Sequence, residues 1–127
     1  MVTELLRHRW RWPVLWALVI LALTSVPASD LPNASLFPGA DKVVHFGLYA
    51  VLGFLAGNAG RGRSRSLAVL VLRVTVGIGV FAALDEVHQR LIPGRSMDVR
   101  DWLADVAGAI VGVCLIGFAR KRREHVT

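Results

Sequence analysis

The chain is poor in charge and almost without cysteine. Only 19% of its 127 residues are charged, whereas 54% are hydrophobic and the mean hydropathy is +0.53. This composition is too apolar for most soluble domains of this length and is typical of an integral membrane protein. Cys114 is the single cysteine, which excludes an intramolecular disulfide and a metal site built from several thiolates.

Acidic residues are also scarce, with 9 Asp and Glu against 15 Lys and Arg, so the formal net charge is +6. In a membrane protein this excess reflects the bias of basic residues toward cytoplasmic loops. The basic turn at 61–65 contains no aromatic residue that would stack on a base, so we expect no nucleic-acid partner. Phosphate-binding glycine loops, nucleophile elbows and HExxH motifs are absent from the sequence.

Four apolar runs divide the chain, at 12–26, 40–59, 67–84 and 102–119. A run of about 20 helical residues crosses the hydrocarbon core of a bilayer. The runs predict an all-α integral membrane bundle of about four transmembrane helices, forming a single domain over 1–127. Basic residues gather before the first run, between the second and third, and after the fourth, which places both termini in the cytoplasm. We expect a multi-pass membrane protein.

The first run allows two interpretations, because it is short for a membrane span. Basic residues precede it and the small residue Ala28 follows it, as in a signal peptide cleaved near that position. Trp10 and Trp12 instead suit the interfacial anchor of a retained helix. We favour the retained helix. The next segment, 29–39, is rich in Pro and Gly and predicts an outer loop.

Polar residues enter the ends of the later runs with helical spacing. Lys42, His45 and Tyr49 are spaced i, i+3, i+7 and share one face of the second run. Glu86 and Gln89 are spaced i, i+3 at the outer end of the third run. Polar groups from different helices therefore meet at one outer rim of the bundle.

The fourth run contributes acids and a stripe of small residues. Asp98, Asp101 and Asp105 share a face if the helix begins near Asp98, and Arg95 lies just before them. The small residues recur every four positions and predict close approach of a second helix, on which Gly53 and Gly57 would serve similarly. The stripe consists of Ala104, Gly108 and Gly112.

These polar motifs resemble the VanZ-like family of small bacterial membrane proteins, which is named for a teicoplanin-resistance accessory protein. The resemblance covers residues 41–112. It rests on Asp41-Lys42-x-x-His45, Asp85-Glu86-x-x-Gln89, Pro93-Gly94-Arg95 and Asp98 with Asp101-x-x-x-Asp105-x-x-Gly108. It implies a multi-span helical protein of the cell envelope. Proteins that resemble this family usually carry Asn at the position of Asp105.

The rim carries more acids than bases, so protons or a cation must balance it. A divalent cation on carboxylate oxygens would do so, with His45 as a nitrogen ligand. The metal-ligand candidates are Glu86, Asp98, Asp101 and His45. The candidate catalytic residues are Glu86, as a general base, with Asp101 and His45. The candidate substrate-binding residues are Lys42, Gln89, Arg95, Asp98, Asp105 and Tyr49.

The location and the resemblance imply a membrane lipid as the partner, either an anionic envelope lipid or a lipid-linked cell-wall intermediate. Its phosphate would lie on Lys42 and on the guanidinium fork of Arg95. The alternative is a non-catalytic scaffold or partner-docking protein, in which the polar rim is a structural network of ion pairs. The sequence leaves open whether a reaction is catalysed.

Asp105 allows two interpretations of its own. As a neutral hydrogen-bonding group it would tolerate replacement by Asn, which the family pattern favours. As a metal ligand or a counter-charge it would not.

Overall fold

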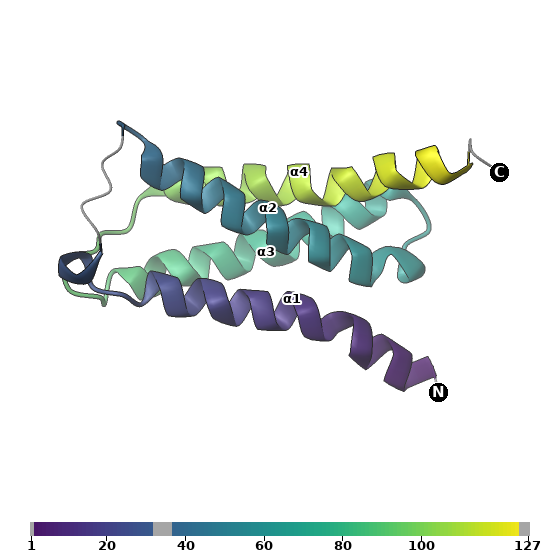
Figure 1. The fold of residues 1–127 in the computed structure, drawn as a ribbon, viewed down its shortest axis with the longest axis horizontal. Helices are drawn as coiled ribbons and strands as arrows, with labels where there is room; N and C mark the ends of the chain where they lie inside the picture. Colours follow the sequence, from purple (N-terminus) through teal and green to yellow (C-terminus); the bar gives the residue numbers. More distant parts are fainter. Residues whose placement is uncertain (1, 32–36, 125–127) are drawn as a thin grey trace.

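The computed structural model of the protein describes residues 2–31 and 37–124, which form a bundle of α-helices (Figure 1). The all-α class is confirmed, since the described ranges contain helices and no strand. The helices are α1 Val2–Thr24, α2 Ala40–Gly60, α3 Leu67–Gln89 and α4 Val99–Glu124. Two short 3-10 turns, Ala28–Asp30 and Arg61–Arg63, follow α1 and α2.

Three segments of the described chain are long and apolar enough to cross a membrane. They are Ala40–Arg63, Leu67–Gln89 and Val99–Ala119, and they contain the second, third and fourth apolar runs. The first run lies in α1, whose crossing of the membrane stays a prediction. The N-terminal end of α1 and the C-terminal end of α4 lie at the same end of the bundle, on the right in Figure 1.

Helix α3 extends beyond the apolar run from which it was predicted. The Ser66 side chain caps its start by accepting the N–H of Val69 at 3.2 Å. The helix continues through Gln89, and the turn at Gly94 with φ of 74° follows. The polar residues after 84 therefore belong to the last turns of α3.

Helices α2 and α4 lie in backbone contact along the predicted stripe of small residues. A Cβ atom at Gly108 would collide with the carbonyl of Phe46, and one at Gly112 with the carbonyl of Ala50. A Cβ at Gly53 would collide in the same way with the backbone of Ala109. Only glycine permits this approach, so the stripe sets how close the two helices lie.

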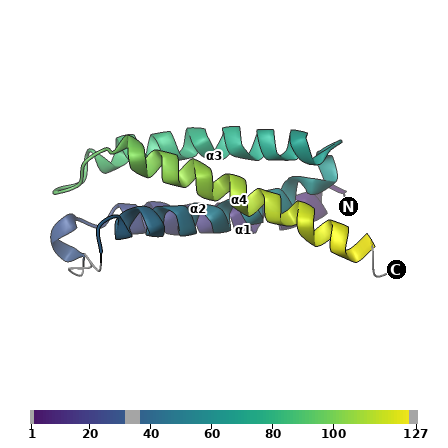
Figure 2. The same ribbon diagram turned by 90° about the horizontal axis from the view of Figure 1, so that it is seen from above.

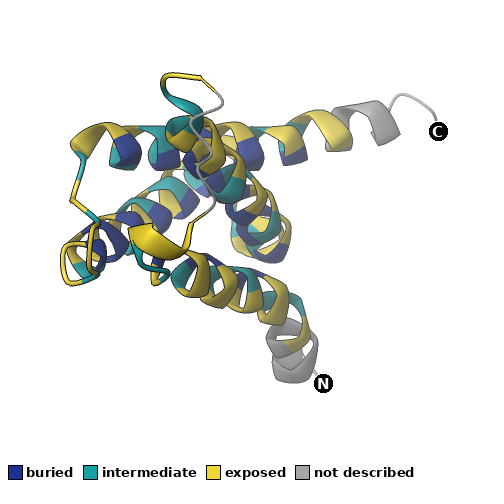
Figure 3. Cartoon of the chain, turned by 60° about the vertical axis from the view of Figure 1, so that its left-hand side comes forward, coloured by how far each residue is buried: buried dark blue, intermediate teal, exposed yellow. Residues whose placement is uncertain are grey.

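The core is apolar, and two indole N–H groups tie neighbouring helices across it. Trp16 of α1 donates to the carbonyl of Leu48 in α2 at 2.9 Å, and Trp102 of α4 donates to that of Gly79 in α3 at 3.0 Å. The fully buried apolar side chains include Ile20, Ala82, Ala109 and Val113. Exposed residues cover the outward faces of the helices (Figure 3), and Figure 2 shows α4 running obliquely from beside α3 across α2.

Replacing Gly112 by Ala is expected to weaken the α2–α4 contact. Overpacking a tight contact costs about 1–3 kcal/mol, so the thermal unfolding temperature of the detergent-solubilised protein should fall. Gly47→Ala is the matched control, because a Cβ at Gly47 meets nothing within 4 Å and alanine favours a helix. Equal unfolding temperatures for the two variants would contradict the packing argument.

Candidate functional site: a buried polar cluster

Polar side chains from all four helices are buried together at the end of the bundle opposite the termini. Three of the acids are almost completely buried, with Asp85 1%, Glu86 3% and Asp105 0% exposed. This group, called the buried polar cluster below, comprises Thr24, His45, Tyr49, Asp85, Glu86, Gln89, Asp101 and Asp105. Apart from Thr24, the sequence places these residues at the outer ends of the second, third and fourth runs. The structure adds that they are buried between the helices.

Asp85 of α3 accepts hydrogen bonds from two hydroxyl groups of other helices. Thr24 of α1 donates to Oδ1 at 2.7 Å, and Tyr49 of α2 donates to Oδ2 at 3.1 Å. An ionised carboxylate only accepts hydrogen bonds, so both oxygens are used in the way that suits the charged form.

Glu86 links the end of α3 to the start of α4. Its Oε1 accepts the side-chain amide of Gln89 at 3.3 Å, and its Oε2 accepts the backbone N–H of Asp98 at 3.0 Å. Asp98 in turn begins α4, since its carboxylate accepts the N–H of Arg100 at 2.8 Å. This hydrogen bond lowers the pKa of Asp98.

His45 of α2 and Asp105 of α4 form the deepest pair of the cluster. His45 Nδ1 lies 2.9 Å from Asp105 Oδ1. The tautomer with its hydrogen on Nδ1 donates a hydrogen bond to this carboxylate oxygen. The second oxygen, Asp105 Oδ2, is buried and has no hydrogen-bond partner among the described residues. Buried acceptors of this kind are rare in folded proteins, and Oδ2 can accept a further hydrogen bond or contact a cation.

His45, Glu86 and Asp105 are close enough to share one metal ion. Each offers one ligand atom, and the three atoms lie within 4.8 Å of one another. One nitrogen and two carboxylate oxygens from three different helices make a donor set for a divalent cation.

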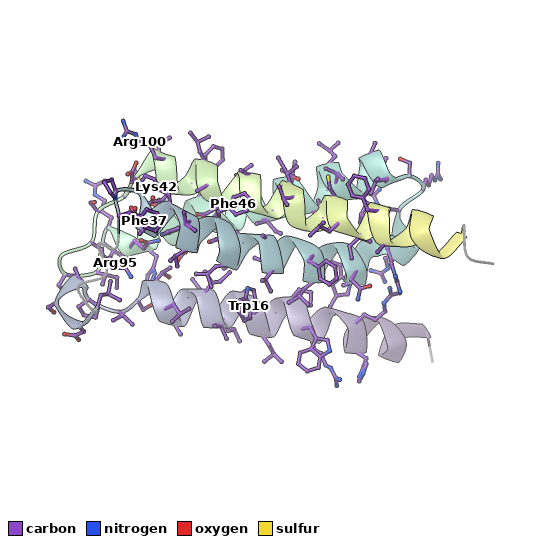
Figure 4. All side chains as sticks on the ribbon, turned by 45° about the horizontal axis from the view of Figure 1, so that its top comes forward. Trp16, Phe37, Lys42, Phe46, Arg95 and Arg100 are labelled. Carbon is purple, nitrogen blue, oxygen red and sulfur yellow. The ribbon has the colours of Figure 1, made fainter. Side chains whose placement is uncertain are left out.

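Lys42 and Arg95, which the sequence grouped as phosphate ligands, have other partners in the structure. The Lys42 ammonium contacts the carboxylates of Asp41, Asp98 and Asp101 at 2.9, 3.4 and 2.9 Å. The Arg95 guanidinium donates from Nε to the carbonyl of Val26 and from Nη2 to that of Leu23. Both residues lie at the end that carries the cluster (Figure 4). Lys42 thus neutralises acids, while Arg95 caps the last turn of α1.

Sequence analysis assigned no role to two members of the cluster. Asp85 stood inside a recognised motif, but nothing in its spacing placed it against α1. Thr24 was missed because a threonine at the end of an apolar run is unremarkable, and its partner lies 61 residues further along the chain. The one available signal was its position four residues after Ile20, on the face of α1 that is buried.

The motifs that carry this cluster are also those of a known family. The sequence model of the VanZ/LLP1 family matches residues 7–120. The chain belongs to the VanZ/LLP1 family. The match begins before and ends after the stretch 41–112, and it confirms the resemblance seen in the sequence. No curated protein and no solved structure matches this VanZ/LLP1 chain. It is an all-helical membrane protein of that family.

Replacing Thr24 by Val is expected to destabilise the protein, because it removes a donor from the buried Asp85. A hydrogen bond to a charged group contributes about 1.5–3 kcal/mol, which should appear as a lower midpoint of denaturant unfolding. Thr75→Val is the control, since the buried Thr75 hydroxyl has no partner and its loss should be neutral or stabilising. Equal losses for the two variants would show that the Thr24 hydroxyl adds no specific stability.

Proposed function

We propose that this protein binds a divalent cation at His45, Glu86 and Asp105, and through it the phosphate of an anionic envelope lipid or lipid-linked cell-wall intermediate. The observation that carries the proposal is the convergence of three ligand atoms within 4.8 Å beside the unpartnered Asp105 Oδ2. A cation would satisfy that oxygen and balance the charge of the cluster.

The charges of the described residues favour a cation. Asp85, Glu86 and Asp105 are each no more than 3% exposed, and His45 is the only basic side chain among the buried residues. Burying an uncompensated carboxylate costs several kcal/mol. The nearby Lys42 is held by three other acids, and Arg95 by backbone carbonyls. Hard ions such as Mg²⁺, Ca²⁺ and Mn²⁺ prefer the oxygen ligands that the acids supply.

The cation also explains how an acidic cluster would bind an anionic lipid. Mg²⁺ is commonly held by one or two carboxylates while its remaining positions take water and phosphate oxygens. The resemblance to this family implies a protein of the cell envelope, where phosphate-bearing lipids are available. A reaction at such a phosphate would use Asp101 as general base, because Glu86 and His45 are taken up by the cation. Asp101 lies nearer the surface, at 9% exposed.

A second candidate function is that of a non-catalytic scaffold or partner-docking protein with a structural polar network. Specific contacts favour it. Lys42 joins α2 to the start of α4, Arg95 joins the α3–α4 connection to α1, and the Thr24–Asp85 bond joins α1 to α3. These contacts hold the helix ends together without a ligand.

Metal and lipid binding separate the two functions. The purified protein should bind about one Mn²⁺ per chain after chelator treatment, as measured by equilibrium dialysis. Asp105→Asn and Glu86→Gln should each weaken that binding at least about tenfold, because each removes a charged ligand. Asp41→Asn should not, since Asp41 is exposed and pairs only with Lys42.

The lipid step is tested with a polyprenyl phosphate and the corresponding polyprenol, by native mass spectrometry. The phosphate should bind only in the presence of the divalent cation, and the alcohol should bind weakly with or without it. If Asp105→Asn folds normally and binds Mn²⁺ like the unchanged chain, the cation site is wrong. The neutral interpretation of Asp105 would then stand. If the protein binds the cation but its lipid binding does not depend on the cation, the lipid part of the proposal is wrong and the cation site stands.

We also propose four spans with both termini in the cytoplasm and α1 retained. Supporting this arrangement, the termini and the basic turn Arg61–Arg63 lie at one end of the bundle (Figure 1), and α1 is bonded to the buried Asp85. The cluster would then face the outer side of the inner membrane.

A cysteine at position 96 should therefore react with an impermeant maleimide in intact cells, and one at position 64 only after permeabilisation. Both are introduced, as Ser96→Cys and Ser64→Cys, into a Cys114→Ser background. A third probe position, Ser35, lies outside the described residues. Labelling at position 64 in intact cells, without labelling at position 96, would show the opposite topology.

A further inference from the structure

We propose that an anionic phospholipid of the leaflet beside the basic turn inserts an acyl chain between α1, α2 and α3, with its phosphate on Arg63 and Arg73. This site lies at the end of the bundle opposite the buried polar cluster. It rests on the proposed membrane topology but not on the proposed cation site, because it shares no residue with the cluster.

A pocket of about 290 Å³ opens between these three helices. Its body is apolar and is lined by Trp10 of α1, Ala56 of α2, and Val74 and Gly77 of α3. Arg63 and Arg73 line it as well, where the turn after α2 meets the first half of α3. An apolar body with two guanidinium groups beside it is the arrangement that an amphiphilic anion requires.

The pocket exists because side chains are small where α1 leaves the bundle. Figure 1 shows α1 running away from α4 toward its N-terminus. A Cβ at Gly77 would meet nothing within 4 Å, so α3 leaves a gap at this level. Arg9 ties α1 to the end of α2 by donating to the carbonyl of Asn58 at 2.7 Å.

The charge around the pocket selects the kind of lipid. The stretch 42–84 contains no Asp or Glu, so the acids of α2 and α3, which are Asp41, Asp85 and Glu86, lie at the opposite end of these helices from the two arginines. Basic pockets between transmembrane helices on the cytoplasmic side bind anionic lipid headgroups. Guanidinium groups also match phosphate by paired hydrogen bonds.

The volume argues for an acyl chain over other occupants. At about 290 Å³ the pocket lies at the lower end of the range of small-molecule pockets, about 300–1,000 Å³, so it has room for part of an acyl chain and not for a packed protein helix. The pocket is partly open and belongs to a bundle whose outer faces are apolar. The surrounding bilayer therefore supplies the occupant directly.

The test uses the full chain in phosphatidylcholine nanodiscs doped with lipid brominated on its acyl chains. Trp10 lines the pocket, and its quenching is isolated by comparing the chain with its Trp10→Phe variant. Brominated phosphatidylglycerol should quench Trp10 more strongly than brominated phosphatidylcholine at equal mole fraction. Arg63→Gln and Arg73→Gln should each reduce this preference about fivefold, the effect of one basic residue at an anionic lipid surface. Arg65→Gln is the control, because Arg65 is exposed in the same turn and does not line the pocket.

A second pair of variants tests the chain-binding part. Gly77→Leu should fill the pocket and abolish the quenching of Trp10, whereas Gly47→Leu, at another open helical glycine, should preserve it. Equal quenching by the two lipids, or equal effects of the two leucine variants, would overturn the proposal. Loss of the phosphatidylglycerol preference on adding inorganic phosphate would also overturn it, in favour of a free-phosphate site.

Discussion

Three carboxylates buried at one end of an apolar bundle are the constraint on which the rest of this structure depends. Removing Asp85, Glu86 and Asp105 from water is costly unless each finds donors. Those donors come from other helices, the hydroxyl of Thr24 from α1 and the imidazole of His45 from α2. Glu86 takes its second donor from the backbone where α4 begins. The acids therefore fix the relative positions of helices that apolar contacts alone would let slide.

The glycine contacts between α2 and α4 supply the matching geometry. Gly108 faces the carbonyl of Phe46, which is the residue directly after His45. Asp105 precedes Gly108 by three residues and so lies on the same face, one turn nearer the start of α4. The close backbone approach thus brings imidazole and carboxylate to 2.9 Å. A larger residue in the stripe would separate the pair, so the packing stripe and the chemistry of the cluster are one feature.

The sequence predicted the helices and their faces well, because both depend on local periodicity. The second run, predicted over 40–59, is the helix Ala40–Gly60, and Lys42, His45 and Tyr49 do point toward the other helices. The burial of side chains and their partners could not be predicted in this way. Asp85 and Glu86 stand at the end of an apolar run, and their burial depends on the helices packed around that turn, which local spacing does not encode. Arg95 binds the end of α1, a contact between segments about 70 residues apart that no local spacing encodes.

The two ends of the bundle present opposite charge to the membrane, and this difference decides how each would meet an anionic lipid. At the basic end Arg63 and Arg73 can contact a phosphate directly, since the stretch 42–84 contains no acid to compete. At the acidic end Lys42 contacts three aspartates and Arg95 donates to two backbone carbonyls, so neither of these two side chains is available to a phosphate at the cluster. A divalent ion on His45, Glu86 and Asp105 would reverse the local charge and make the same headgroup attractive. Dependence on a divalent cation is therefore the property that distinguishes lipid binding at the two ends of this protein.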